Sequence, residues 1–281
     1  MSLLPRFEES QNLSLLKSLS PLTRKVLWNP LIYRIYERML WNQIKSGKMP
    51  EHIGIVLDGN RRWASEQSLY PWDGHLFGAE KVEELLDWCL ELKIKAITLY
   101  VFSTENFRRS AKEINKIFSI AKEKLKKLLS DSRIHENRVR IKAIGRINLL
   151  PGDLKEVILK AEETTKDYDE HYLNIAIAYG GRAEIVDATI RIAEEVKEGK
   201  LNPDQIDEKT IESHLYTSHL PKVDSDLIIR TSGEERLSGF LLWQGAYSEL
   251  CFLDVYWPDF RKIDLWRAIR AYQGRWRRYG R

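Results

Sequence analysis

Short runs of apolar residues alternate with longer amphipathic stretches from residue 52 to the end of the chain. Six runs are rich in β-branched and aromatic residues, as in strands buried on both faces: 52–57, 96–102, 139–145, 172–178, 226–230 and 249–255. Apolar residues recur every three or four positions in 77–93, 111–130, 153–167, 182–198, 207–218 and 262–279, which predicts helices. The alternation predicts an α/β fold: a single domain with a central, mostly parallel six-stranded sheet flanked by helices.

Residues 1–48 have a different pattern from the rest of the chain. The segment 21–48 interleaves Trp, Tyr and aliphatic residues with Lys and Arg, which indicates one or two amphipathic helices. We therefore expect an amphipathic helical N-terminal extension over 1–48 and a catalytic domain over 49–281. The apolar face of the extension either packs on the main domain, the favoured interpretation, or makes a peripheral membrane contact.

Composition narrows the class of protein. The 281 residues are 43% hydrophobic and 31% charged, which is typical of a globular protein. The formal net charge of +4 is too small to predict a nucleic-acid partner. Cys89 and Cys251 lie among apolar residues, which indicates buried thiols in a reducing compartment. Because neither a secretory signal nor an apolar run of about 20 residues is present, we expect a cytoplasmic protein.

Four polar segments either follow a predicted strand or open a predicted helix. They are 58–64 (DGNRRWA), 74–78 (GHLFG), 103–109 (STENFRR) and 230–239 (RTSGEERLSG). In an open α/β sheet, ligands bind beyond the carboxyl ends of the strands. Glycine, hydroxyl groups and paired arginines at such positions favour phosphate binding. An Asp-Gly turn followed by a helix cap would explain the first segment without any function.

Two arginine-rich loops and one strand-end aspartate together indicate an enzyme that handles two phosphorylated substrates with Mg²⁺. Kinases, phosphatases and transferases that release diphosphate all remain open at this point. The chain has no G-x-x-x-x-G-K-[ST] loop and no G-x-G-x-x-G fingerprint, so neither ATP nor NAD is favoured.

Five motifs in this order resemble the cis-prenyltransferase family, which includes undecaprenyl diphosphate synthase. They are HIGIVLDGNRRWA, GHLFGAEKV, TLYVFSTENFRR, LNIAIAYGGRAEI and IIRTSGEERLSGFLLWQGAYSELCFLDVYWPDF, and they span about residues 52–279. The resemblance implies a homodimeric, Mg²⁺-dependent transferase that condenses isopentenyl diphosphate with an allylic prenyl diphosphate. Such an enzyme forms Z double bonds, releases diphosphate and makes a polyprenyl diphosphate for a carrier lipid.

The same resemblance implies roles for individual residues. Asp58 and Asn106 match catalytic residues, and Asp58 and Glu249 match residues associated with metal. A further group of residues matches the family's diphosphate-binding residues or lies beside them: Gly59, Asn60, Arg61, Arg62, Trp63, His75, Ser103, Glu105, Phe107, Arg109, Arg230, Arg236 and Ser238. The helices over 77–93 and 111–130 would wall a tunnel for the growing chain. Candidate lining residues, for which ordinary core packing is an equal interpretation, are Leu85, Leu86, Trp88, Cys89, Ile117 and Phe118.

The chain departs from the family pattern in two places. The run 69–73 has no arginine where Pro71 stands, and Glu235 and Gly239 replace a frequent His and Asn. An alternative function is therefore transfer of the prenyl group to a non-isopentenyl acceptor such as a hydroxyl compound. A noncatalytic partner subunit is a third hypothesis, which the two complete phosphate loops disfavour.

Overall fold

The computed structural model describes residues 30–275, which fall into two compact units that divide between Gly47 and Lys48. The described part of the first unit is the helix α3 (Pro30–Ile44), on which Leu40 and Ile44 are buried while Leu31 and Ile35 are exposed. Residues 21–29 of the predicted amphipathic segment lie outside the described part. No helix within residues 30–275 is long and apolar enough to cross a membrane.

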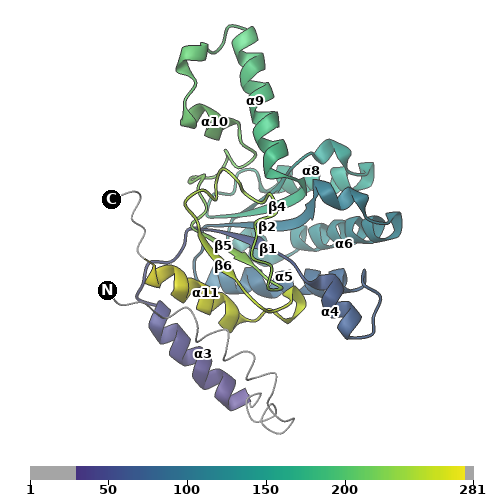
Figure 1. The fold of residues 1–281 in the computed structure, drawn as a ribbon, viewed down its shortest axis with the longest axis vertical. Helices are drawn as coiled ribbons and strands as arrows, with labels where there is room; N and C mark the ends of the chain where they lie inside the picture. The colour runs from purple at the N-terminus through teal and green to yellow at the C-terminus, as the bar shows by residue number, and fades with distance from the viewer. Residues whose placement is uncertain (1–29, 276–281) are drawn as a thin grey trace. The chain divides into compact units, whose positions relative to one another are not determined.

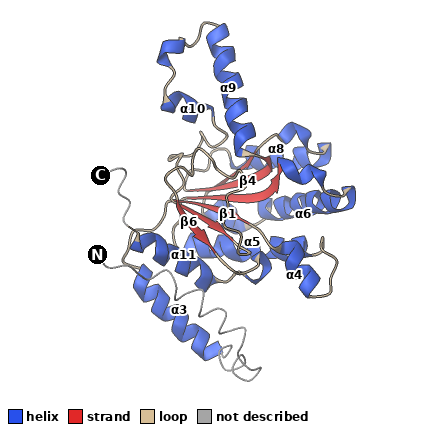
Figure 2. Ribbon diagram, viewed as in Figure 1, coloured by secondary structure: helices blue, strands red, loops and turns tan. Residues whose placement is uncertain are grey.

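The second unit is built on one six-stranded sheet (Figures 1 and 2). Its strands are β1 (His52–Val56), β2 (Ala96–Ser103), β3 (Val139–Ile144), β4 (His171–Tyr179), β5 (Leu227–Arg230) and β6 (Glu249–Phe252). All five neighbouring pairs are parallel, in the order β3-β4-β2-β1-β5-β6. The predicted α/β fold and its six strands are confirmed, because continuous apolar runs suit strands that are covered on both faces.

Helices lie between all consecutive strands except β5 and β6, and they cover the sheet (Figure 2). The predicted helices correspond to α5 (Gly74–Glu91), α6 (Ala111–Leu129), α8 (Gly152–Thr165), α9 (Gly181–Lys197), α10 (Glu208–His214) and α11 (Lys262–Gly274). Helix α10 ends four residues earlier than predicted because Leu215 is extended, with φ −68° and ψ 158°. The structure adds the short helices α4 (Asn60–Glu66) and α7 (Ser132–Glu136) and the 3₁₀ turns η1 (Thr104–Arg108), η2 (Ile147–Leu149), η3 (Pro203–Gln205) and η4 (Trp257–Asp259). Residues 276–279 of the last predicted helix lie outside the described part.

The order of the strands creates one topological switch point. From β1 the chain builds β2, β3 and β4 on one side, and it then crosses back to add β5 and β6 on the other side. The carboxyl ends of β1 and β5 therefore lie side by side where the connections diverge. Such a crevice is the usual ligand site of an open α/β sheet. It brings together the segments 58–64 and 230–239.

Candidate active site

The carboxylate of Asp58 lies directly beyond the end of β1, at the switch point. The next residue, Gly59, has φ +99°, and its N–H donates to Asp58 Oδ1 at 2.7 Å. A Cβ at position 59 would come within 2.7 Å of the Tyr256 ring, so only glycine fits there. Arg230 Nη2 donates to Asp58 Oδ2 at 2.8 Å. Burial raises the pKa of Asp58, but Arg230 and the Gly59 amide outweigh it and hold that pKa below its usual value.

Arg230 also closes the loop that follows β5. Its side chain is buried, and its Nη1 donates both to the carbonyl of Arg236 and to Ser238 Oγ, the latter at 2.8 Å. Ser238 has φ +49°, a backbone conformation that residues other than glycine rarely adopt. Tertiary contacts must therefore hold it. One buried guanidinium thus joins the loop after β1 to the loop after β5.

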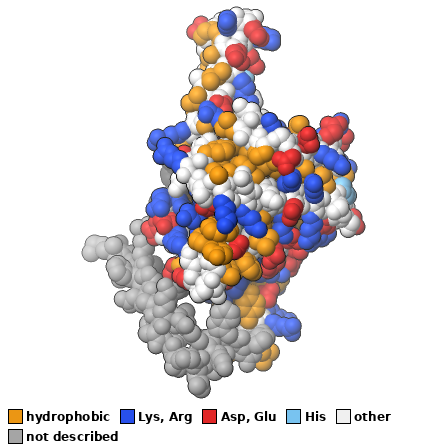
Figure 3. Space-filling model, turned by 90° about the vertical axis from the view of Figure 1, so that its right-hand side faces the viewer, with side chains coloured by type: hydrophobic (Ala, Val, Ile, Leu, Met, Phe, Trp, Pro, Cys, Tyr) orange, Lys and Arg blue, Asp and Glu red, His pale blue; other side chains and the backbone are white. Residues whose placement is uncertain are grey.

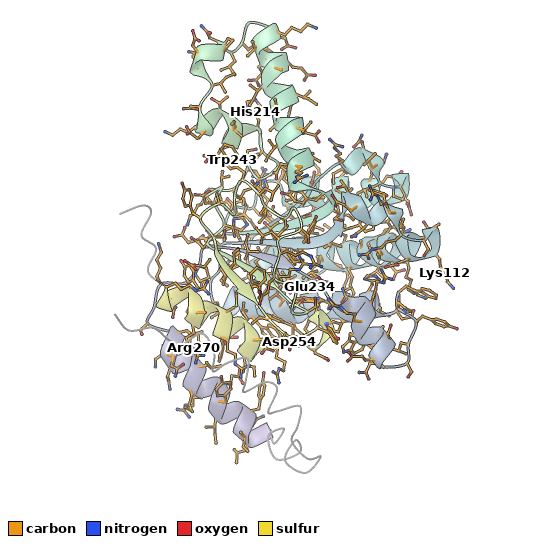
Figure 4. All side chains as sticks on the ribbon, in the orientation of Figure 1. Lys112, His214, Glu234, Trp243, Asp254 and Arg270 are labelled. Carbon is orange, nitrogen blue, oxygen red and sulfur yellow. The ribbon has the colours of Figure 1, made fainter. Side chains whose placement is uncertain are left out.

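Glu234 links two further arginines, both of them exposed. Its Oε1 lies 3.3 Å from Arg62 Nη1 and its Oε2 lies 2.6 Å from Arg236 Nη1. Arg62 also donates to Ser232 Oγ at 2.5 Å. Figure 4 shows Glu234 between the strand ends and α4. Because the two guanidiniums are 45% and 64% exposed, they can exchange one carboxylate for the greater charge of a diphosphate. The two predicted anion sites are therefore contiguous.

A buried carboxylate that the sequence analysis missed organises a second group of basic side chains. Glu113, in the first turn of α6, lies 3.1 Å from His75 Nε2 and 2.9 Å from Arg109 Nη1, and Arg61 Nε is 3.8 Å away. The hydrogen bond from His75 is the strongest influence that holds the pKa of Glu113 below its usual value. Glu113 follows Ser110 by three residues, so its only signal in the sequence is that of a helix cap. Ser110 Oγ does accept the Glu113 N–H.

The end of β2 turns sharply into η1. Ser103 N–H donates to Asn106 Oδ1 at 3.0 Å in a capping box. The amide oxygen of Asn106 is thus committed to the backbone. Burial raises the pKa of Glu105, but hydrogen bonds from its own N–H and from Ser103 outweigh this and lower it. Phe107 packs edge-on against Phe102, with ring centroids 5.0 Å apart.

Two segments of the site, α4 and α5, pack closely against each other. Asn60 Nδ2 donates to the Leu57 carbonyl at 3.1 Å, and its Oδ1 is buried without a partner among the described residues. A Cβ at Gly78 would meet that oxygen at 2.2 Å, so the glycine lets α5 approach α4. Trp257 Nε1 donates to the Gly78 carbonyl at 2.7 Å.

The loop that lacks an arginine at Pro71 does have a cation beside it, which comes from α6. Lys112 Nζ lies 4.4 Å from the ring of Trp72, which stacks on Tyr70 at 4.9 Å (Figure 4). On the face shown in Figure 3, basic side chains gather near its middle beside exposed hydrophobic ones. The sequence departure at Pro71 therefore does not leave this part of the chain without positive charge.

A cavity of about 730 Å³ opens at these residues and extends between the sheet and helices α5, α6 and α8. Its deeper walls are apolar, and on β4 they come from alternate residues that share one face of the sheet, Leu173, Ile175 and Ile177. Nine predicted site residues line the cavity: Asp58, Asn60, His75, Ser103, Glu105, Asn106, Arg109, Arg230 and Ser238. The site therefore combines an anion-binding mouth with a hydrocarbon-sized interior.

Some predicted residues have other places. Trp63 packs on Phe77 with ring centroids 4.8 Å apart and, like Phe107, does not line the cavity. Of the six candidate tunnel residues only Ile117 lines it. Periodicity identifies an apolar helix face but does not distinguish residues that pack on the sheet from residues beside a void. The lining from α6 continues instead through Ile120, Leu125 and Leu128.

Glu249 does not reach Asp58 within one chain. The register of β5 and β6 pairs Glu249 with Leu227, at the opposite end of β5 from Arg230. Three residues of strand separate these levels by about 10 Å. Glu249 Oε2 instead accepts a hydrogen bond from Arg275 at 2.8 Å. Within a single chain Asp58 and Glu249 therefore lie at opposite ends of the parallel strands, and a metal role for both residues stays a prediction.

The donor set at the mouth fits a magnesium ion that is held partly by substrate. Mg²⁺ commonly binds through one or two carboxylates together with substrate phosphates, and it keeps several waters. The described residues contain no group of three or more His, Cys, Asp or Glu side chains arranged to hold a metal. Asp58 provides one ionised carboxylate that is 31% exposed at the cavity mouth. This matches a cation shared with a diphosphate rather than an all-protein cage.

Arginine-rich loops at a switch point above a deep apolar cavity form a site suited to diphosphates that carry hydrocarbon chains. Comparison with known proteins agrees. Residues 56–280 match the family model described as "Putative undecaprenyl diphosphate synthase". The chain belongs to this family and is a prenyltransferase.

Two similar relatives have the same descriptive name, tritrans,polycis-undecaprenyl-diphosphate synthase (geranylgeranyl-diphosphate specific). The protein of Methanopyrus kandleri is 54% identical over 89% of this chain and 92% of its own length. The protein of Pyrococcus horikoshii is 50% identical over 92% of this chain and 96% of its own length. A crystal structure of lavandulyl diphosphate synthase from Lavandula x intermedia, in complex with dimethylallyl diphosphate, aligns with a TM-score of 0.80 and 34% identity, covering 83% of this chain and 99% of that one.

Proposed function

We propose that this protein is a cis-prenyltransferase that condenses isopentenyl diphosphate with an allylic prenyl diphosphate and makes a polyprenyl diphosphate for a carrier lipid. The observation that carries the proposal is the apolar cavity of about 730 Å³ that opens beside Asp58 and Arg230. An enzyme for small polar phosphates has no need of such an interior. The names of the relatives support a geranylgeranyl starter, which has four isoprene units, and an undecaprenyl product, which has eleven.

The contiguous anion sites would hold the two substrates side by side. The loop 59–62 and His75 would bind the allylic diphosphate, and Arg236 and Ser238 would bind the isopentenyl diphosphate. The buried Arg230 holds both loops in place through Asp58 and Ser238. Fixed alignment of two reactants lowers the entropic part of the barrier.

In the reaction, a new carbon–carbon bond forms while the allylic carbon–oxygen bond breaks and diphosphate leaves with the electron pair. Arginines and backbone amides stabilise the charge that develops on the leaving group. When bound at Asp58, Mg²⁺ supplies further neutralisation of that charge. The isopentenyl carbon skeleton then loses a proton.

We infer that the departing diphosphate, rather than Asp58, accepts this proton. Both oxygens of Asp58 already accept hydrogen bonds, from the Gly59 N–H and from Arg230, which makes its carboxylate less available as a base. The homodimer, the cytoplasmic location and the membrane contact of residues 21–48 stay predictions.

The test is incubation of the purified protein with Mg²⁺, labelled isopentenyl diphosphate and allylic diphosphates of increasing length, with products resolved by mass. We expect a ladder or one long product. If the allylic diphosphate is consumed only with a nonphosphorylated acceptor, and isopentenyl units are never added, the alternative acceptor function replaces the proposal. Without consumption of either diphosphate, the noncatalytic hypothesis would apply.

A further inference from the structure

One charged side chain interrupts the apolar wall that α5 and α6 contribute to the cavity. The other charged lining residues, such as Asp58, Arg109 and Arg230, lie at or beyond the carboxyl ends of strands. Lys124 lies 13 residues beyond Ala111, about 20 Å along α6 at 1.5 Å per residue. Its ammonium group is therefore remote from the diphosphates.

The ammonium group belongs to an ionic cluster between the two helices. Glu83 of α5 accepts from Lys124 Nζ at Oε1 and from Lys127 Nζ at Oε2, each at 2.6 Å. We name these three residues the α5–α6 clamp. The side chains of Glu83 and Lys124 are 25% and 26% exposed, whereas that of Lys127 is 61% exposed. The clamp thus runs from the cavity wall to solvent.

A second, small cavity of about 30 Å³ lies against the same wall. Ala79, Val82, Lys124 and Leu128 line both cavities, so these residues form the partition between them. The small cavity is lined in addition by Glu83, Leu86, Lys127 and Asp131. The partition is mostly apolar, and the clamp beside it extends to the exposed Lys127, so an exit from the large cavity between α5 and α6 would pass through it.

The size of the large cavity makes such an exit necessary, provided that the proposed function is correct. A cavity of about 150 Å³ accommodates benzene, which corresponds to about 25 Å³ per carbon and about 125 Å³ per isoprene unit. At this density the cavity of about 730 Å³ holds about six units. The relatives are named for an undecaprenyl product, which has eleven units. A product of that length exceeds this capacity.

We propose that Glu83, Lys124 and Lys127 set the product length, because the hydrocarbon end of the growing chain leaves the cavity between α5 and α6 where the clamp closes the partition. Additions up to about the sixth unit take place with the clamp closed. Each later addition requires the two ion pairs to separate and the apolar residues beside them to contact the chain. The opening of the clamp then limits the late additions but not the early ones.

The experiment compares the mass distribution of products, and the rates of early and late additions, for the full chain and three variants. Glu83→Gln removes both ion pairs with little change in shape, whereas Leu128→Trp fills the partition. Asp153→Asn is the matched control, because it breaks the Lys122–Asp153 pair (2.6 Å) between α6 and α8, and neither residue lines either cavity. A control is needed because acidic and basic side chains are interspersed on the molecular face in Figure 3.

We expect Glu83→Gln to speed the late additions by about two- to thirtyfold relative to the early ones, the range expected for two partly exposed ion pairs. Its products should become longer. Leu128→Trp should accumulate products of about six units, and Asp153→Asn should match the unmodified chain. Elongation with unchanged lengths in Glu83→Gln would overturn the clamp and leave the proposed function intact. If the unmodified chain adds no isopentenyl unit, the proposed function fails and the clamp has no role.

Discussion

The substitution Glu113→Gln tests whether the buried carboxylate positions His75 and Arg109. Glu113 is 6% exposed, and Arg109 Nη1 and His75 Nε2 lie within 3.1 Å of it. The amide of glutamine keeps the shape of the side chain but provides no charge for Arg109. Because the Arg109 side chain is 27% exposed, water replaces only part of the lost interaction. A hydrogen bond to a charged group contributes about 1.5–3 kcal/mol, so we expect a loss of that size.

If the loss falls on the catalytic arrangement, it corresponds to a decrease in kcat/KM of about 10- to 150-fold. The assay measures kcat and KM for both diphosphates, together with urea unfolding. Glu123→Gln on the exposed face of the same helix is the control, and we expect it to leave both measurements unchanged. Glu113→Asp, which retains the charge, should recover part of the activity.

Two results would refute the reasoning about Glu113. If Glu113→Gln lowers the free energy of unfolding but leaves kcat/KM unchanged, the carboxylate supports the fold and does not position the site. If neither quantity changes, solvent screens the contacts at 2.9 and 3.1 Å far more than the burial of Glu113 indicates.

Three further predictions concern the mouth of the cavity and the opposite end of the sheet. Asp58→Asn should lower kcat about a hundredfold or more in single-turnover assays, since it removes the charge that pairs with a buried arginine, and a near-normal rate would remove Asp58 from the mechanism. Gly78→Ala should lower the free energy of unfolding by about 1–3 kcal/mol, because the new Cβ would meet Asn60 Oδ1 at 2.2 Å; equal stability in urea would show that Asn60 moves freely. Burial lowers the pKa of His52 from 6.5 to about 4, so the unfolded chain takes up the proton at a higher pH than the folded chain. The free energy of unfolding should therefore decrease by about 3 kcal/mol as pH falls from 7 to 4. His52→Gln should flatten that part of the pH profile relative to the unmodified chain, and an identical slope would contradict the assignment to His52.

The sequence alone determined the features that depend on neighbouring residues. Six apolar runs rich in β-branched residues predicted the strands, because a strand buried on both faces needs a continuous apolar run. The segments 58–64 and 230–239 stood out because glycine and paired arginines are unusual directly after such runs. These local signals were sufficient for the fold class, and their order along the chain was sufficient for the family resemblance.

Tertiary structure decided the features that depend on register and on the order of strands in space. The order β3-β4-β2-β1-β5-β6 brings Asp58 and Arg230 within 2.8 Å, whereas the parallel register of β5 and β6 places Glu249 at the other end of the strands. The role of Glu113 depends on the meeting of α5 and α6, since His75 precedes it by 38 positions. The cavity likewise arises from the spacing of helices against the sheet, which helical periodicity along one segment does not encode. Local patterns specify elements, but only the packed chain specifies which of their side chains share a site and which enclose a void.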